Sequence, residues 1–188
     1  MKQQCGINYK QIIRQIEEKQ HSTFCTIDNL SPDKLPTKRR GLYWIWTNLS
    51  LDELANSSDD ITKGTKKVPL VKLINQRKGL ENICGIKKNG FTLVYNGIGG
   101  YNSESKSFGL RERLLQEFNA TNAKTGSLNI TERFKDKNNW AVSFFDFDDP
   151  GNQDILALLQ SENPYLEFAS DLEKLWRLEF GHPILCRY

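Results

Sequence analysis

The feature that most constrains the fold of this chain is an Asn-Gly pair, Asn89 and Gly90, that separates two apolar runs. The runs span residues 83–86 and 91–95. Asn-Gly readily adopts the left-handed backbone conformation of a two-residue turn, so this pattern is the strongest short-range signal for a β-hairpin. We therefore expect an antiparallel pair of strands in the middle of the chain.

Other elements are predicted from the spacing of apolar residues. Residues 41–46 form an aromatic and β-branched run typical of a strand, and residues 139–147 alternate large and small side chains. The polar residues 50–64 predict a surface loop, and the glycines at 96–100 predict a turn after the hairpin. Helical spacing predicts helices at residues 9–19, 68–77, 109–118, 155–159 and 170–180.

This order of elements predicts an α+β fold, in which helices flank a small, mostly antiparallel central sheet. A chain of 188 residues is long enough to build such a core as one domain with an elaboration. We expect an N-terminal helical extension at residues 1–34 and a main domain at residues 35–188. An insertion at about 51–86 would separate its first two strands.

Composition excludes several classes of protein. Hydrophobic residues make up 38% of the chain and aromatic residues 11%, which is too rich for a disordered protein. No apolar run approaches about 18 residues, so we expect no membrane-spanning helix, and the first residues lack the apolar stretch of a secretory signal. Four scattered cysteines and two histidines predict no structural zinc site. We expect an intracellular protein, in the cytoplasm or the nucleus.

Two tyrosines, one arginine and one acid form a constellation that suits phosphodiester hydrolysis. Tyr43 and Tyr95 each lie beside a glycine on a predicted strand. Arg113 lies on the next helix, and Glu173 opens the predicted last helix. An arginine stabilises charge that develops on a phosphate, an acid holds a divalent cation, and a tyrosine relays a proton.

Four motifs in this order resemble the GIY-YIG nuclease family. In this sequence they are Gly41-Leu42-Tyr43 after Leu35-Pro36, Tyr95-Asn96-Gly97, Leu110-x-x-Arg113-Leu114, and Glu173 followed by Trp176, Phe180 and Pro183. The resemblance spans about residues 35–188. It implies a GIY-YIG-like domain that acts as a metal-dependent endonuclease on DNA.

The resemblance also implies a role for each of the four residues. Arg113 would bind and stabilise the scissile phosphate, and Glu173 would bind one Mg²⁺ or Mn²⁺ ion. Tyr43 would be the general base or orient the water, and Tyr95 would be a phosphate or proton-network partner. Restriction, homing and repair roles stay open, as does cleavage of RNA. A restriction role would favour a homodimer, because two chains with one site each cut both strands most simply.

Three positions depart from the family pattern and motivate an alternative. Ile98 stands where the family often has a polar or basic side chain, Glu117 replaces a frequent histidine one turn after the arginine, and Cys186 lies near the position of an asparagine. The two tyrosines are also 95 − 43 = 52 residues apart, farther than in compact family members. The alternative function is a catalytically inactive nucleic-acid-binding module on the same fold.

The metal-binding acid is either Glu173 or Glu179. The two lie six residues apart on one predicted helix, or about 240° around its axis, so they cannot face one site. We prefer Glu173, because a helix N-terminus favours an ionised carboxylate. Glu179 falls in the apolar stripe of the helix, where it would need a buried partner.

Basic residues cluster beside the first motif and in the insertion, and Arg111 offers a positive charge that Ile98 does not. A patch of this kind can track phosphates of DNA, although the plain alternative is a solvated surface. We expect DNA contacts from Lys38, Arg39, Arg40, Lys66, Lys67, Lys72, Lys78 and Arg111.

Overall fold

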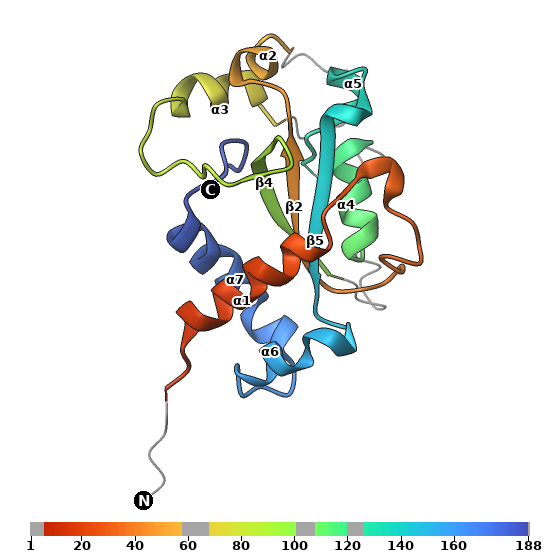
Figure 1. Cartoon of the computed structure of the whole chain (residues 1–188), viewed down its shortest axis with the longest axis vertical. Coiled ribbons are helices and arrows are strands. Elements are labelled where there is room, and N and C mark those ends of the chain that lie inside the picture. The colour runs from red at the N-terminus through yellow and green to blue at the C-terminus, as the bar shows by residue number, and fades with distance from the viewer. Residues whose placement is uncertain (1–5, 58–67, 101–107, 120–125, 188) are drawn as a thin grey trace, which may run out of the picture.

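The computed structural model describes residues 6–57, 68–100, 108–119 and 126–187 (Figure 1). Its five strands form one antiparallel sheet in the spatial order β1-β5-β2-β4-β3. The strands are β1 (Cys25–Thr26), β2 (Gly41–Thr47), β3 (Lys87–Lys88), β4 (Phe91–Gly99) and β5 (Trp140–Asp146). The helices are α1 (Tyr9–Ser22), α2 (Leu51–Ala55), α3 (Leu70–Arg77), α4 (Leu110–Phe118), α5 (Ile130–Arg133), α6 (Gln153–Ala157) and α7 (Pro164–Phe180). The predicted α+β fold with an antiparallel sheet between helices is confirmed.

The sheet is covered on both faces, which is why every residue of β2 and β5 is buried. Side chains alternate along β2, so that Tyr43 and Ile45 face one layer and Trp44 and Trp46 the other. The first layer contains apolar residues of α3 and α4, and the second contains residues of α1, α6 and α7. Helices α1 and α7 also pack against each other (Figure 1).

The central hairpin is confirmed at its turn but not along its first strand. Asn89 and Gly90 both have positive φ angles, 49° and 84°, as a turn of this type requires. The first strand, β3, has only Lys87 and Lys88, whereas the prediction placed it at residues 83–86. Those residues instead pack against the C-terminal segment, where Cys84 donates its backbone N–H to the carbonyl of His182 at 3.0 Å.

The predicted glycine turn at residues 96–100 is wrong, because β4 runs on to Gly99. The glycines serve close packing. A Cβ atom on Gly97 would lie 2.4 Å from the Tyr43 hydroxyl, and one on Gly99 would lie 2.4 Å from the Cα atom of Leu110. Glycine therefore lets the ring of Tyr43 and the start of α4 lie directly on the strand.

Two helix boundaries also differ from the predictions. The last helix begins at Pro164, six residues before the predicted start, with proline in the first turn where its missing N–H costs nothing. Glu173 thus lies in mid-helix and does not open the helix. Residues 51–55, predicted as loop, form α2, which is stabilised by a capping box between Ser50 and Glu53. A five-residue helix is too short to show apolar periodicity.

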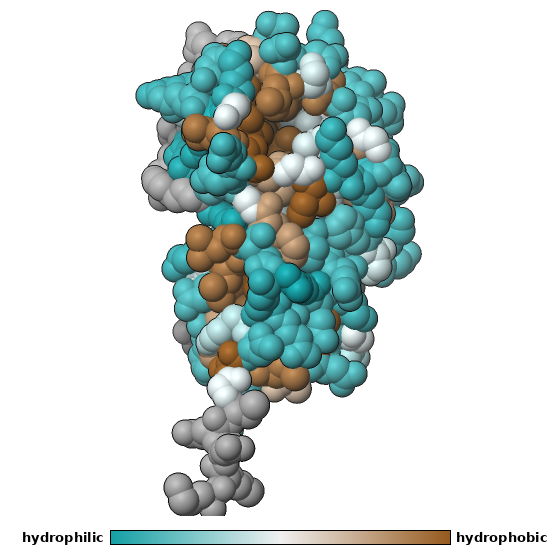
Figure 2. All heavy atoms as spheres, turned by 60° about the vertical axis from the view of Figure 1, so that its left-hand side comes forward, coloured by the Kyte–Doolittle hydropathy of each residue, from teal (hydrophilic) through white to brown (hydrophobic). Residues whose placement is uncertain are grey.

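Parts of the surface of α7 are apolar. Leu166 and Leu178 are 71% and 81% exposed. Figure 2 brings the side of the molecule with α3 and α7 forward and shows separate apolar patches among hydrophilic side chains. Within the described ranges, no helix combines the length and the apolar character needed to cross a lipid bilayer.

Candidate active site

A cavity of about 620 Å³ lies at the outer edge of β4. The short strand β3 pairs only with Phe91 and Thr92 at the start of β4. Farther along, the C-terminal segment takes the place of a strand, and Leu185 donates its N–H to the carbonyl of Val94 at 2.9 Å. The cavity is lined from β2, β4, α4, α7 and the C-terminal segment, and the polar side chains among its walls are Tyr43, Tyr95, Asn96, Arg113, Glu173, Lys174, Arg177, Cys186 and Arg187.

The structure brings all four predicted catalytic residues, Tyr43, Tyr95, Arg113 and Glu173, to this cavity. Tyr43 lies opposite Gly97 in the β2–β4 register. The rings of Tyr43 and Tyr95 are 6.2 Å apart. Tyr43 is only 1% exposed.

Glu117 is the polar centre behind these residues. Its Oε1 atom accepts a hydrogen bond from the Tyr43 hydroxyl at 2.8 Å and lies 2.6 Å from Nη2 of Arg113. Its Oε2 atom accepts the backbone N–H of Leu128 at 2.8 Å. Both carboxylate oxygens are therefore occupied by donors. Because the side chain is fully buried, they are also shielded from water. This saturation makes Glu117 a poor ligand for a metal ion.

Arg113 is held by more than its ion pair. Nη1 donates to Oε1 of Gln116 at 2.7 Å, and Nη2 donates to the carbonyl of Gly126 at 2.9 Å. Burial alone would lower the pKa of Arg113, but Tyr43 and Glu117 outweigh it and raise the pKa. The guanidinium is therefore charged and fixed in direction at the cavity wall.

Burial raises the pKa of the other ionisable groups in this cluster. The pKa values of Tyr43 and Tyr95 lie well above 10, chiefly because both rings are desolvated and also because Glu117 is nearby. The pKa of Glu117 is raised by desolvation as well, although Arg113 and the Leu128 amide act against this. Both tyrosines are consequently protonated at neutral pH.

Glu173 supplies the carboxylate that lines the cavity itself. Its Oε1 accepts a hydrogen bond from Nη2 of Arg177, one turn later on α7, at 2.7 Å. Burial raises the pKa of Glu173, whereas Arg177 and Lys174 act to lower it. The ionised form of Glu173 therefore depends on neighbouring cations. The expected stabilisation of this carboxylate by a helix N-terminus is wrong, because Glu173 lies in mid-helix.

Glu179 points to a different part of the molecule. Its Oε1 accepts hydrogen bonds from Nε and Nη2 of Arg14 on α1, at 3.1 and 2.9 Å. Lys10 lies 3.7 Å from the same oxygen. Of the two acids considered for the metal, the geometry thus leaves Glu173 in the cavity and places Glu179 between α1 and α7.

The C-terminal wall of the cavity is fastened by the insertion. Arg77, the last residue of α3, donates to the carbonyls of Ile184 and Arg187 at 3.0 Å each and also to that of Cys186. The Cys186 thiol donates to Oδ1 of Asn96 at 3.2 Å. Burial raises the pKa of Cys186 to about 12, so this thiol is protonated and serves packing and hydrogen bonding.

The carboxylate at the cavity suits a divalent cation. Mg²⁺ uses one or two carboxylates and keeps several water ligands, so a single open carboxylate is sufficient. Glu173 fits this requirement, since it lines the cavity and is still 16% exposed. Within the described ranges, no three His, Cys, Asp or Glu side chains gather as a candidate metal cage.

The residues predicted to bind DNA are distributed over several surfaces. Lys66 and Lys67 lie outside the described residues. Lys72 and Lys78 are exposed on and after α3, and Arg111 is half-buried on α4. None of these described side chains lines the cavity.

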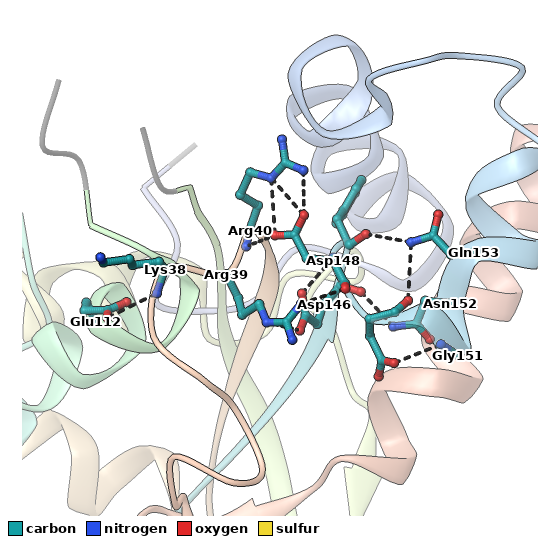
Figure 3. A network of polar contacts seen from close by, with 11 residues as sticks. Lys38, Arg39, Arg40, Glu112, Asp146, Asp148, Gly151, Asn152 and Gln153 are labelled. Atoms are coloured by element: carbon teal, nitrogen blue, oxygen red, sulfur yellow. Dashed lines mark hydrogen bonds and ion pairs between the residues drawn. The ribbon is translucent and has the colours of Figure 1, made fainter. Parts of the chain in front are cut away.

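Lys38, Arg39 and Arg40 belong to a separate polar network at the end of β5 (Figure 3). The backbone N–H and Nε of Arg40 donate to Oδ2 and Oδ1 of Asp148 at 2.8 and 3.0 Å. Nη1 of Arg39 donates to the carbonyl of Asp148 at 2.7 Å. The backbone N–H of Lys38 donates to Glu112 at 3.4 Å. These contacts join the segment before β2 to α4 and to the residues that follow β5.

Sequence reasoning missed Glu117 as a member of the site, treating it only as the loss of a histidine, and it missed Arg177. A local signal was present in both cases. Glu117 follows Arg113 by four residues, and Arg177 follows Glu173 by four, so each candidate residue has an oppositely charged neighbour on the same helix face. An oppositely charged residue four positions from a predicted site residue is therefore itself a candidate member of the site.

Comparison with known proteins adds no relative. No protein-family model matches the chain, and no curated protein or solved structure matches it.

Proposed function

We propose that this chain is a divalent-metal-dependent endonuclease that hydrolyses phosphodiester bonds in DNA at the cavity beside β4. The observation that carries the proposal is the charge of the described cavity wall. Four basic side chains, Arg113, Lys174, Arg177 and Arg187, surround one carboxylate, Glu173, next to two tyrosines. Such a wall attracts a phosphodiester and leaves one ligand for a cation.

The order of the elements supports a GIY-YIG-like domain. The first motif lies on the central strand β2, and the second lies on its neighbour β4. The arginine follows on α4, and the acid comes on the last helix, α7. This arrangement is what the motif resemblance implies, and it brings motifs far apart in the sequence to one cavity.

Each cavity residue has a role in this proposal. Arg113, whose direction is fixed by Gln116 and Gly126, stabilises charge on the scissile phosphate. Glu173 holds one Mg²⁺ or Mn²⁺ ion, and Arg177 favours the ionised carboxylate that this requires. The bound cation supplies Lewis-acid polarisation of the phosphate. Tyr43 orients the attacking water and takes its proton, and Tyr95 completes the hydrogen-bonding network.

The biological setting follows the same reasoning. We place the activity inside the cell, in the cytoplasm or nucleus, where DNA is available. A chain with one such site cleaves both strands most simply as a homodimer. Cleavage of a randomised duplex library, followed by sequencing of the product ends, distinguishes restriction or homing, which give a consensus, from repair, which follows DNA structure.

A second candidate is a nucleic-acid-binding module without turnover. The observation in its favour is that both cavity-lining arginines on helices are already paired, Arg113 with Glu117 and Arg177 with Glu173. Pairing lowers the net charge available to a phosphate. In this alternative the cavity binds a phosphate by exchange of partners and performs no hydrolysis.

Single-turnover cleavage of plasmid and short duplex DNA across a Mg²⁺ titration separates the two candidates. Glu173→Gln is expected to retain DNA binding and to lose at least about 100-fold in rate, comparable to the removal of one preorganised electrostatic group. Glu179→Gln is the matched control, since it changes an acid on the same helix away from the cavity, and full cleavage is expected. DNA binding by the unaltered chain without any cleavage would support the binding module. An inactive Glu179→Gln beside an active Glu173→Gln would contradict the metal assignment.

A further inference from the structure

Tyr43 is a weak base by itself, although the proposed hydrolysis needs a proton acceptor. The pKa of Tyr43 lies well above 10, because the ring is desolvated and the carboxylate of Glu117 is close. At neutral pH the group is a protonated phenol, which accepts a proton from water only when it gives up its own. The acceptor of that second proton must lie within hydrogen-bonding distance.

Glu117 occupies the required position. The Tyr43 hydroxyl donates to its Oε1 atom at 2.8 Å. Tyr43 lines the cavity and Glu117 does not, so Tyr43 is the residue that connects the carboxylate to the cavity. Glu117 is completely buried, and its second oxygen is held by the Leu128 amide, so the carboxylate cannot turn away.

We propose that Glu117 is the terminal proton acceptor of a relay that runs from the attacking water through the Tyr43 hydroxyl. The relay rests on the proposed hydrolysis. In it, Glu117 is the positioning residue that allows Tyr43 to act as a base. The water oxygen forms a bond to phosphorus as the bond from phosphorus to the leaving oxygen breaks. One water proton passes to Tyr43 Oη, and the original Tyr43 proton passes to Glu117 Oε1. The leaving oxygen takes a proton from solvent, and Glu117 returns its proton to solvent as the product leaves.

The groups around Glu117 suit a reversible acceptor. Arg113 on α4 and the hydroxyls of Tyr43 on β2 and Tyr95 on β4 stabilise the ionised carboxylate, while burial favours the protonated acid. Burial is the larger effect, so the pKa of Glu117 is raised towards neutrality. An acceptor with a pKa closer to the working pH is charged before the step and still able to take the proton.

The relay predicts a particular pattern in a double-mutant cycle of Tyr43→Phe and Glu117→Gln. Single-turnover cleavage is measured from pH 5 to pH 10 in saturating Mg²⁺. Each single variant is expected to lose about 100-fold or more in rate at pH 7, the usual range for one proton-transfer group. The double variant is expected to be no slower than Tyr43→Phe, because Glu117 acts only through Tyr43.

The pH profile gives a second readout that a purely structural role would not produce. The unaltered chain needs ionised Glu117, so its rate falls as the pH falls through the raised pKa of Glu117 and levels off above it. In Glu117→Gln this acid limb disappears, and the rate rises towards pH 10 as Tyr43 begins to ionise. Ultraviolet titration of tyrosine should show Tyr43 ionising at lower pH in Glu117→Gln, because a neighbouring negative charge is gone.

Controls separate the relay from folding and from the proposed hydrolysis. Glu112→Gln removes a carboxylate from α4 that does not line the cavity, and unchanged rates are expected. Glu117→Asp keeps a proton acceptor, so its cleavage rate should still level off at high pH, although at a reduced value. This variant tests the relay if Glu117→Gln does not fold. Cleavage by the unaltered chain with additive losses in the cycle, or a Glu117→Asp rate that rises up to pH 10, would overturn the relay alone. No cleavage by the unaltered chain would overturn the hydrolysis and the relay together.

Discussion

Two clusters of arginine and carboxylate differ in what surrounds them. The cavity cluster consists of Arg113, Glu117 and Tyr43, and the β5-end cluster consists of Arg39, Arg40, Asp146 and Asp148. In the cavity cluster the side chains of Arg113 and Glu117 are 16% and 0% exposed. In the β5-end cluster those of Arg40 and Asp148 are 34% and 21% exposed. Similar charges are thus placed in very different dielectric surroundings.

The partners of the carboxylates also differ. Asp148 and Asp146 accept backbone N–H groups, from Arg40 at 2.8 Å and from Asp148 at 2.8 Å, respectively, so their role is to close the end of the sheet. Glu117 accepts one backbone N–H but shares its other oxygen between Tyr43 and Arg113. Burial raises the pKa of Asp146 to about 6, so desolvation is felt in both clusters. In the cavity cluster the desolvated carboxylate of Glu117 also accepts a hydrogen bond from a tyrosine hydroxyl.

The largest expected effect comes from Arg113→Ala. It leaves the buried Glu117 without its cation, and breaking a buried pair of this kind costs about 3–5 kcal/mol of unfolding free energy. Cleavage should also be lost, because the cation proposed to stabilise charge on the scissile phosphate is gone. Thermal melting and plasmid nicking measure the two effects.

Arg111→Ala is the matched control for Arg113→Ala, since Arg111 lies on the same helix and does not line the cavity. It is expected to change the melting temperature little and to keep the cleavage rate per bound DNA, even where Arg111 contributes a DNA contact. If Arg113→Ala melts like the unaltered chain, Glu117 is not a buried anion that depends on Arg113, and the contrast between the clusters disappears. If both arginine variants cleave fully, Arg113 has no part in the reaction.

A smaller effect is expected from Gly97→Ala, which tests the packing of Tyr43 on β4. The added Cβ would meet the Tyr43 hydroxyl at 2.4 Å, so the buried ring would have to shift from its place on β4. Overpacking of a core costs about 1–3 kcal/mol, and displacement of the hydroxyl from Glu117 should slow cleavage. Gly85→Ala, where an added Cβ meets nothing within 4 Å, is the control in melting and cleavage assays. Equal behaviour of the two variants would show that Tyr43 is not held against Gly97.

The smallest effect is expected from Arg40→Ala in the β5-end cluster. Its ion pair with Asp148 is partly exposed and screened by solvent, so its loss should cost no more than about 1 kcal/mol of unfolding free energy. Cleavage per bound DNA should be unchanged, because Arg40 does not line the cavity. Urea unfolding and single-turnover cleavage test this. A loss of stability as large as that of Arg113→Ala would remove the distinction between the clusters.

Local sequence signals predicted much of the framework. The Asn89-Gly90 turn, the strands β2 and β5 and the helices α1, α3 and α4 were predicted near their observed places, because each rests on turn chemistry or apolar periodicity. Tyr43, Tyr95, Arg113 and Glu173 were singled out by motif, and all four line one cavity. The errors fell at the first strand of the hairpin, at α2, at the glycines of β4 and at the start of α7. In the hairpin and at the glycines, contacts with distant segments override local preference, and α2 is too short to show apolar periodicity.

The sequence by itself therefore determined the antiparallel strands, the helices with clear periodicity and the residue types available for chemistry. Only the tertiary structure decided which charges are buried and which partners reach them from other segments of the chain. Glu117 is an ordinary helix residue until β2 brings Tyr43 to it and the residues after α4 bring the Leu128 amide. Burial and pKa depend on the desolvation produced by segments far apart in the chain, and that quantity does not exist until those segments pack.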